Sequence, residues 1–556
     1  MLFKEFKVAG PSRPNPRFSR REFCIRGGMS LLLSGLLFTG PIQAGTSKPT
    51  SADTARFLTQ STFGPTNAVI SQVQSSGFSS FLSQQFSTPA TLTVPRVNAA
   101  IAALPSGTNP TNSIFQEAWW YTVVTAPDQL RQRVAFALSE ILVVSANNND
   151  MGNNPEAMAT YWDLLTQDAF GNFRQLLEDV TLDPAMGDFL DMVHNGAPNP
   201  KKNIEANENY AREIMQLFTV GLYQLNQDGS QQLDANKQPI PTYSQAVVTG
   251  NAQVFTGWTW AQSGTPTWNG GPPNYLQQMM AFPAQHDTTD AKPQLNSVSL
   301  PAGQTQAQDL ESCLNIIFNH PNVGPFIARR LIQRLVTSNP SPAYVARIAK
   351  VFADNGQTVR GDLKAVVQAI LLDPEARTTT FGTGYGHERE PIVRLANLFR
   401  AFNASAASGR FVVSSPNFNF GQAALFAPTV FNFFTPDYSQ PGPIQQAGLF
   451  APEFQITTDS TVITSANAMR SAVYQQPDPN NPDAIVLDLS SLAKLAPNPG
   501  SLVNSLTNLL MEGSMSSNTQ SIVVKTVGKI PAANTLERAQ TAVQLLVTSP
   551  EFVIEQ

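Results

Sequence analysis

Residues 325–373 read "PFIARRLIQRLVTSNPSPAYVARIAKVFADNGQTVRGDLKAVVQAILLD" and repeat one pattern three times. Apolar residues recur at spacings of three and four over 325–338, 343–356 and 361–373, and residues such as Pro and Gly separate these segments. This spacing places the apolar side chains on one face of an α-helix. We therefore predict three consecutive amphipathic helices here, and a fold built mainly from helices.

The same helical spacing extends outward from this stretch over most of the chain. Further helices are predicted over residues 52–64, 66–77, 78–86, 114–126, 128–145, 159–170, 171–182, 388–402 and 535–549. The length of 556 residues and a hydrophobic content of 42% allow a large buried core. The predicted fold class is mainly α, a large multi-helix globular domain.

Strand signals are few. Residues 254–260 and 278–287 flank a segment rich in Gly and Pro, which predicts one small β-hairpin on the helical body. Residues 411–415 and 484–489 are shorter strand candidates. The aromatic segment 414–443 is broken by prolines, so we expect a long packed loop.

The first 44 residues differ from the rest in composition. They hold seven basic and two acidic side chains, a twin arginine (Arg20 and Arg21), and a mild apolar run of about a dozen residues that ends near Ala44. This order predicts a twin-arginine export signal, with the mature protein in the periplasm or outside the cell. An uncleaved anchor is the alternative, although the run is short for a membrane span.

Beyond the signal, we predict a main helical domain over residues 45–473, a linker over 474–483 and a C-terminal helical tail over 484–556 that packs on the main domain. Without the signal, 28 of the 35 basic and 38 of the 40 acidic side chains remain, a net charge of −10. An acidic chain of this kind lacks the basic surface of a nucleic-acid-binding protein. Only Cys313 remains, so neither an internal disulfide nor a cysteine metal site is expected.

Charged side chains crowd around the sequence "NENYARE" at residues 207–213. On a helical wheel, one arc carries the polar residues Glu205, Glu208, Asn209, Arg212, Glu213 and Gln216. The arc has three interpretations: the solvated face of an amphipathic helix, a buried polar network in which Arg212 binds carboxylates, or a catalytic or metal-binding role for Glu208 or Glu213.

Histidine is rare, and none of the four histidines forms a local zinc motif. In the segment "QHDTTDAK", His286 and Asp287 follow the predicted hairpin. A His-Asp pair in a loop can bind a divalent cation or support acid–base chemistry, and it can equally be a hydrogen-bonded turn. The other three, His194, His320 and His387, lie at predicted helix ends. The sequence holds no G-x-S-x-G, P-loop or dinucleotide-binding motif.

Several segments, in order, carry a family resemblance. They are "TARFLTQSTFGPT", "AFGNFRQLLEDVTLDPAMGDFLD", "NENYAREIMQLFTVG", "FTGW", "HD…K", "HPN…FIARRLIQRLV", "GDLKAVVQAIL" and "LLVTSPEF". Together they resemble the bacterial domain-of-unknown-function 1800 family over about residues 52–553. The family's motif residues correspond here to Asn207, Glu208, Asn209, Arg212, Glu213, Gly257, Trp258, His286, Asp287 and Lys292.

The resemblance implies an exported, mostly helical bacterial protein, often encoded beside a twin-arginine-exported, sulfatase-like protein. The chain also departs from the family pattern. Many members carry a His-Asn-His-Phe run where this chain reads "FALSEILVVS" (136–145), and a histidine in place of Phe218. Histidine-based chemistry therefore has less support in this chain than in those members.

Two functions are expected from these observations. The first is a non-enzymatic binding or assembly component that acts with a co-exported, sulfatase-like partner. The alternative is a metal-dependent hydrolase acting on cell-envelope or extracellular polymers, in which Arg212 is a further candidate catalytic residue. There, Glu208, Glu213, His286 and Asp287 would meet in one cleft as catalytic residues or as ligands of a divalent cation.

Overall fold

The computed structural model describes residues 48–147 and 151–555. The described residues belong to one compact unit, Lys48–Gln556. The predicted export signal, residues 1–44, lies outside them. Within the described part of the chain, no helix combines the length and the apolar character that a membrane span requires.

Helices dominate the described residues, which confirms the predicted fold class. The α-helices are α1 (Ser51–Ser61), α2 (Asn67–Ser76), α3 (Phe78–Ser87), α4 (Val94–Ala102), α5 (Asn112–Thr125), α6 (Gln129–Ser139), α7 (Pro155–Asp168), α8 (Phe173–Leu182), α9 (Pro184–Phe189), α10 (Asn209–Gln216), α11 (Gln245–Val254), α12 (Gln306–Phe318), α13 (Val323–Leu335), α14 (Pro342–Ala353), α15 (Leu363–Leu372), α16 (Pro391–Ala401), α17 (Pro416–Phe420), α18 (Pro443–Gln446), α19 (Asp459–Tyr474), α20 (Ser490–Leu495), α21 (Pro499–Met511), α22 (Ser517–Gly528), α23 (Thr535–Val547) and α24 (Pro550–Val553).

The remaining regular elements are short. The 3₁₀ turns are η1 (Pro200–Lys202), η2 (Pro283–Gln285), η3 (Leu295–Ser297) and η4 (Pro452–Gln455). The strands are β1 (Trp258–Thr259), β2 (Met280–Ala281), β3 (Lys292–Pro293), β4 (Ser299–Leu300), β5 (His387–Glu388) and β6 (Ile554–Glu555), which pair antiparallel as β1–β2, β3–β4 and β5–β6.

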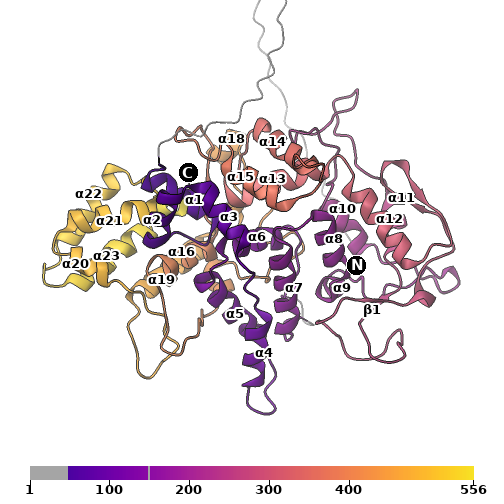
Figure 1. The fold of residues 1–556 in the computed structure, drawn as a ribbon, viewed down its shortest axis with the longest axis horizontal. Helices are drawn as coiled ribbons and strands as arrows, with labels where there is room; N and C mark the ends of the chain where they lie inside the picture. Colours follow the sequence, from indigo (N-terminus) through magenta and orange to yellow (C-terminus); the bar gives the residue numbers. More distant parts are fainter. Residues whose placement is uncertain (1–47, 148–150, 556) are drawn as a thin grey trace, which may run out of the picture. The chain divides into compact units, whose positions relative to one another are not determined.

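The three helices predicted from residues 325–373 are α13, α14 and α15, which lie side by side (Figure 1). Local caps fix where two of them begin. Ser341 accepts a hydrogen bond from the backbone N–H of Tyr344, and Asp362 accepts one from Ala365. The apolar faces of all three helices are buried, so periodicity, caps and packing agree on the same structure.

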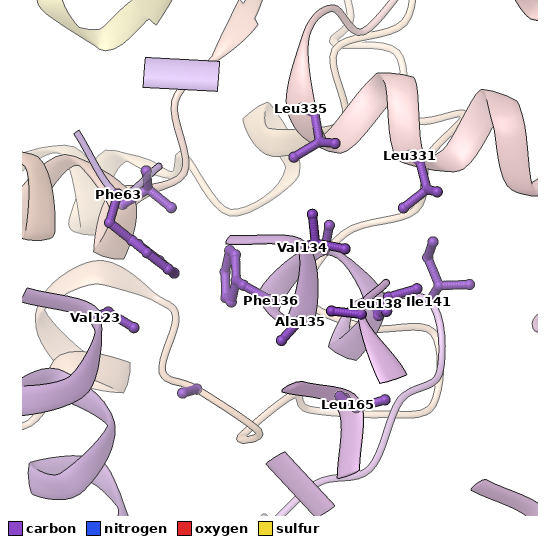
Figure 2. Packing of buried hydrophobic residues seen from close by; sticks show 14 of the residues in the cluster. Phe63, Val123, Val134, Ala135, Phe136, Leu138, Ile141, Leu165, Leu331 and Leu335 are labelled. Atoms are coloured by element: carbon purple, nitrogen blue, oxygen red, sulfur yellow. The ribbon is translucent and has the colours of Figure 1, made fainter. Parts of the chain in front are cut away.

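Helix α6 lies in the middle of the core. Figure 2 shows side chains of this helix, such as Phe136, between Phe63 and Leu165, with Leu331 and Leu335 of α13 on another side. All of these side chains are buried. Nearly every position of α6 is buried as well.

Helix α6 ends at Ser139, six residues before the predicted end at residue 145. Beyond the helix, Ser145 donates a hydrogen bond to the carbonyl oxygen of Ala427 over 2.6 Å, and the N–H of Ala146 donates to Leu425 over 2.8 Å. These bonds to a distant loop replace the next helical turn, which a helix pattern alone does not anticipate.

The predicted hairpin exists as β1 and β2, but it is only two residues long on each side. Val254, which we assigned to its first strand, ends helix α11 instead. Residues 411–415 form no strand, and residues 484–489 contribute only a single bridge, between Val486 and Ser405. The C-terminal helices pack on the rest of the unit, with α23 against α19 and α21 against α1 (Figure 1).

Candidate functional site

Glu208 is the residue before α10, which begins at Asn209 and so leaves Glu205 of the predicted polar arc outside the helix. The carboxylate of Glu208 accepts hydrogen bonds from Arg212 (2.9 Å), from Gln245 Nε2 (2.8 and 3.0 Å) and from Thr249 Oγ1 (2.9 Å). The ion pair with Arg212 is partly exposed, so it contributes little to stability. Glu208 therefore holds α10 against the first turns of α11.

Glu213 is the buried member of this cluster. Burial raises the pKa of its carboxyl group, while the charge of Arg212 opposes the rise. Burial also raises the pKa of Tyr243 to about 12, against the effect of Arg212 and with a contribution from Glu213. On the polar arc, the side chain of Glu208 is therefore partly exposed to solvent, whereas Glu213 is buried.

The asparagines of the motif have structural partners. The N–H of Asn207 donates to Asn195 Oδ1 over 2.8 Å, and Asn195 returns a bond to the carbonyl oxygen of Asn207. The N–H of Asn209 donates to Asn207 Oδ1, and Asn209 Nδ2 donates to Asp191 Oδ2 over 3.0 Å. These bonds fix the chain where it enters α10.

His286, Lys292 and Asp309 form a buried charged cluster. Asp309 Oδ2 lies 3.0 Å from His286 Nε2 and 3.0 Å from Lys292 Nζ, and all three side chains are almost completely buried. Asp309 comes from α12 and was not among the residues singled out in the sequence. The carboxylate of Asp309, shared by the imidazole of His286 and the ammonium group of Lys292, holds the 286–292 loop on α12.

The partners of His286 fix the orientation of its ring. Its Nδ1 faces the carbonyl oxygen of Thr256 at 3.0 Å and the hydroxyl oxygen of the same residue at 3.2 Å. That hydroxyl donates its own proton to Gln253, so it can only accept from the ring. Nδ1 therefore faces two acceptors, and Nε2 lies 3.0 Å from the carboxylate of Asp309.

Asp287 forms no hydrogen bond with Asp309 or Lys292. Its N–H donates to Thr256 Oγ1, and its Oδ1 accepts from the N–H and the hydroxyl of Thr289 at 2.9 and 2.8 Å. This is the hydrogen-bonded turn that the sequence allowed as one interpretation. The polar partners of Arg212 are Glu208 and Gln245, so Arg212 and Asp287 share no partner.

Helix α11 separates the two groups of candidates. Glu208 is bonded to its first two turns, through Gln245 and Thr249, whereas His286 is bonded to Thr256 beyond its last turn. Over residues 48–147 and 151–555, no three His, Cys, Asp or Glu side chains are grouped so that they could hold a metal ion. The catalytic and metal-binding roles of Glu208, Arg212, Glu213, His286 and Asp287 stay predictions.

Gly257 of the "FTGW" motif lies where the backbone must come close to this cluster. Its φ is +84°, and a Cβ atom there would be 2.8 Å from Gln306 Nε2 and 2.9 Å from the backbone nitrogen of His286. We expect Gly257→Ala to lower the free energy of unfolding by roughly 2–4 kcal/mol, from backbone strain plus overpacking. Urea denaturation followed by circular dichroism measures the change.

The matched control for this substitution is Gly264→Ala. Gly264 has nearly the same φ, +82°, and a Cβ atom there would meet nothing within 4 Å. Its substitution carries the backbone strain without the contact. Equal losses in the two variants would show that the close approach at Gly257 does not matter.

A second set of charged residues, which we call the buried ion network, was not predicted from the sequence. It joins segments from α6 to β6, and its members are Arg133, Glu140, Arg334, His387, Glu388, Arg389, Glu390, Arg394, Glu453, Glu512 and Glu555. His387 Nε2 lies 3.2 Å from Glu555 Oε2, and Arg334 Nε lies 3.5 Å from Glu140 Oε2. Arg389 also pairs with Glu512.

Several groups of this network have pKa values that differ from their usual values in water. Burial by itself lowers the pKa of His387, but the hydrogen bond and charge of Glu555, with the charge of Glu453, raise it to about 9. Burial raises the pKa of Glu453 to about 7, against the charges of His387 and Arg334. Burial also raises the pKa of Glu140 well above its usual range, and the neighbouring Glu390 adds to the rise. Burial and the neighbouring charges together thus set the pKa values of this network.

The fold and these sites define a mainly α-helical protein with two groups of buried, interacting charged residues. The family described as "Protein of unknown function (DUF1800)" matches residues 56–554. This chain belongs to that family, as its motifs indicated. No curated protein and no solved structure matches it.

Proposed function

We propose that this chain is an exported helical binding component that assembles with a co-exported, sulfatase-like partner in the periplasm or outside the cell. Twin-arginine export carries folded proteins, so a preformed binding surface would survive the passage. The proposal also fits the candidate residues in the motif, which are largely bonded to other parts of the same chain.

The observation that carries the proposal is a group of exposed apolar side chains on two contacting helices. Phe418 of α17 is 71% exposed, and Ile463 and Val462 of α19 are 62% and 53% exposed. Hydroxyl groups of α19 bond to the carbonyl oxygen of Asn419, which keeps the two helices together. Large apolar side chains exposed on two neighbouring helices support a protein interaction site on this part of the surface.

Co-purification tests this proposal. The mature chain and the sulfatase-like protein encoded beside it should elute together, and the double variant Phe418→Ser/Ile463→Ser should weaken binding about 10-fold or more, as loss of buried interface residues does. Ile522→Ser on α22 is the control, because this side chain is 52% exposed on another helix. Absence of a complex at all salt concentrations would contradict the proposal.

The alternative, a metal-dependent hydrolase acting on envelope or extracellular polymers, also stays a proposal. It rests on Glu208, Glu213, His286 and Asp287 as ligands of a divalent cation. Elemental analysis of the folded, purified chain tests it directly. A stoichiometric metal that is lost in Glu208→Gln and His286→Gln, and kept in Glu205→Gln, would favour the hydrolase.

A further inference from the structure

The two helices with the exposed apolar side chains also line a groove of about 460 Å³. We call it the α17–α19 groove. Its apolar lining includes Leu395 of α16, Ala468 of α19 and Ile485. Its volume is within the range of sites that bind small molecules or short peptide segments.

The groove also carries polar side chains that are free to bind a ligand. Asn467 and Ser471 lie one turn apart on α19, and Asn481 faces the groove from the segment before Ile485. All three residues are exposed, and their side chains form no hydrogen bond with the described residues. Amide groups offer both donors and acceptors, as a peptide backbone requires.

The lining is nearly neutral. Asp483 is the one ionisable residue among the described residues that line the groove. Its carboxylate is already bonded to Arg410 Nη1 at 3.0 Å, and Arg410 in turn binds Glu117 through two hydrogen bonds of 3.0 and 2.6 Å. A charged ligand would therefore lose its hydration without gaining an unpaired opposite charge.

The aromatic residues of the groove indicate whether it is suited to a peptide or to a sugar. Phe399 and Phe420 line it, but they are only 3% and 1% exposed, so neither offers a ring face on which a sugar could stack. The accessible apolar surface is aliphatic instead. This favours the small and branched side chains of a polypeptide.

From these contacts we infer that the α17–α19 groove binds an extended, uncharged polypeptide segment with apolar side chains, supplied by the co-exported partner. The inference rests on the proposed function and names the part of the partner that binds. From Thr464 of α19 to Gln475, which directly follows this helix, the groove lining rises about 16 Å along the helix axis. An extended segment of about five residues covers this length.

Selection from a displayed library of random seven-residue peptides on the folded, immobilised chain tests the inference. The expected winners lack Asp, Glu, Lys and Arg and are rich in Val, Ile and Ala. Ala468→Trp, which fills the groove, should reduce their enrichment at least 10-fold. Ala532→Trp places the same side chain on an exposed loop and should leave the enrichment unchanged.

Other outcomes overturn the inference: no enrichment, enrichment of charged peptides, or enrichment that Ala468→Trp does not reduce. The partner experiment separates the two proposals. If the partner still co-elutes with Ala468→Trp at wild-type affinity, the groove is not its binding site, although the proposed function stands. If peptides bind the groove and no partner co-elutes, the groove is a peptide-binding site but the proposed function is wrong.

Discussion

We expect Asp309→Asn to lower the free energy of unfolding by about 3–5 kcal/mol, because it removes the counter-charge of a buried group. Asp309 Oδ2 lies 3.0 Å from both Lys292 Nζ and His286 Nε2, and none of the three side chains is more than 1% exposed. Without this carboxylate, Lys292 remains buried without a counter-charge. The urea midpoint and the Tm measure the loss.

Glu311→Gln is the matched control for this prediction. It is the same change from acid to amide on the same helix, at a side chain that is 63% exposed in its ion pair with Arg174. We expect an effect below about 1 kcal/mol there. The double variant Lys292→Met/Asp309→Leu should recover most of the stability, since it removes both buried charges. If Asp309→Asn behaves like Glu311→Gln, the cluster does not stabilise the fold.

The sequence predicts most of the helices because local signals and burial agree. The helices from 325 to 373 have apolar periodicity, Ser341 and Asp362 as caps, and a buried face. Prediction fails where distant contacts decide the backbone. Helix α6 stops at Ser139 because the next residues bond to a loop near Ala427, almost 300 positions later in the sequence.

The candidate site was predictable only in part, for the same reason. Glu208 and Arg212 form their expected pair, because four residues on a helix bring them together. Glu213 lies on the same polar arc but is buried in the fold, which no local pattern reveals. Asp309 stands in the first turn of α12, where an acidic residue is typical of a solvated helix start.

The buried ion network is least visible in the sequence. Its members come from segments as far apart as Arg133 and Glu555. Each is a charged residue in an otherwise ordinary helix or loop, and His387 in particular reads as the start of a helix. Instead, β5 and β6 pair, which brings His387 opposite Glu555. Only the three-dimensional fold shows that these charges neutralise one another.

The protein should unfold more easily at pH 9 than at pH 5.5, with a Tm lower by several degrees. Burial raises the pKa of Glu453 to about 7 from its usual 4.5. The stability linked to its protonation is fully present below pH 4.5 and is lost as the pH rises through 7. The pKa of His387 is raised from 6.5 to about 9, so its contribution is fully present below 6.5 and lost as the pH rises through 9. Both groups therefore act in the same direction between pH 5.5 and pH 9.

The variant Glu453→Gln isolates one group of this pH dependence. An amide cannot ionise, so the variant should lose less Tm between pH 5.5 and pH 9 than the wild type, with the gap opening around pH 7. Glu205→Gln, at an exposed position, should keep the wild-type profile. Below pH 4.5 the trend reverses in part because of Glu555. Burial by itself raises the pKa of Glu555, but the hydrogen bond and charge of His387 hold this pKa below its usual value, so its contribution to stability is lost as the pH falls. A wild-type Tm that is the same at pH 5.5 and pH 9 would contradict this prediction. It would mean that the charged groups of the network become exposed to solvent before the protein unfolds.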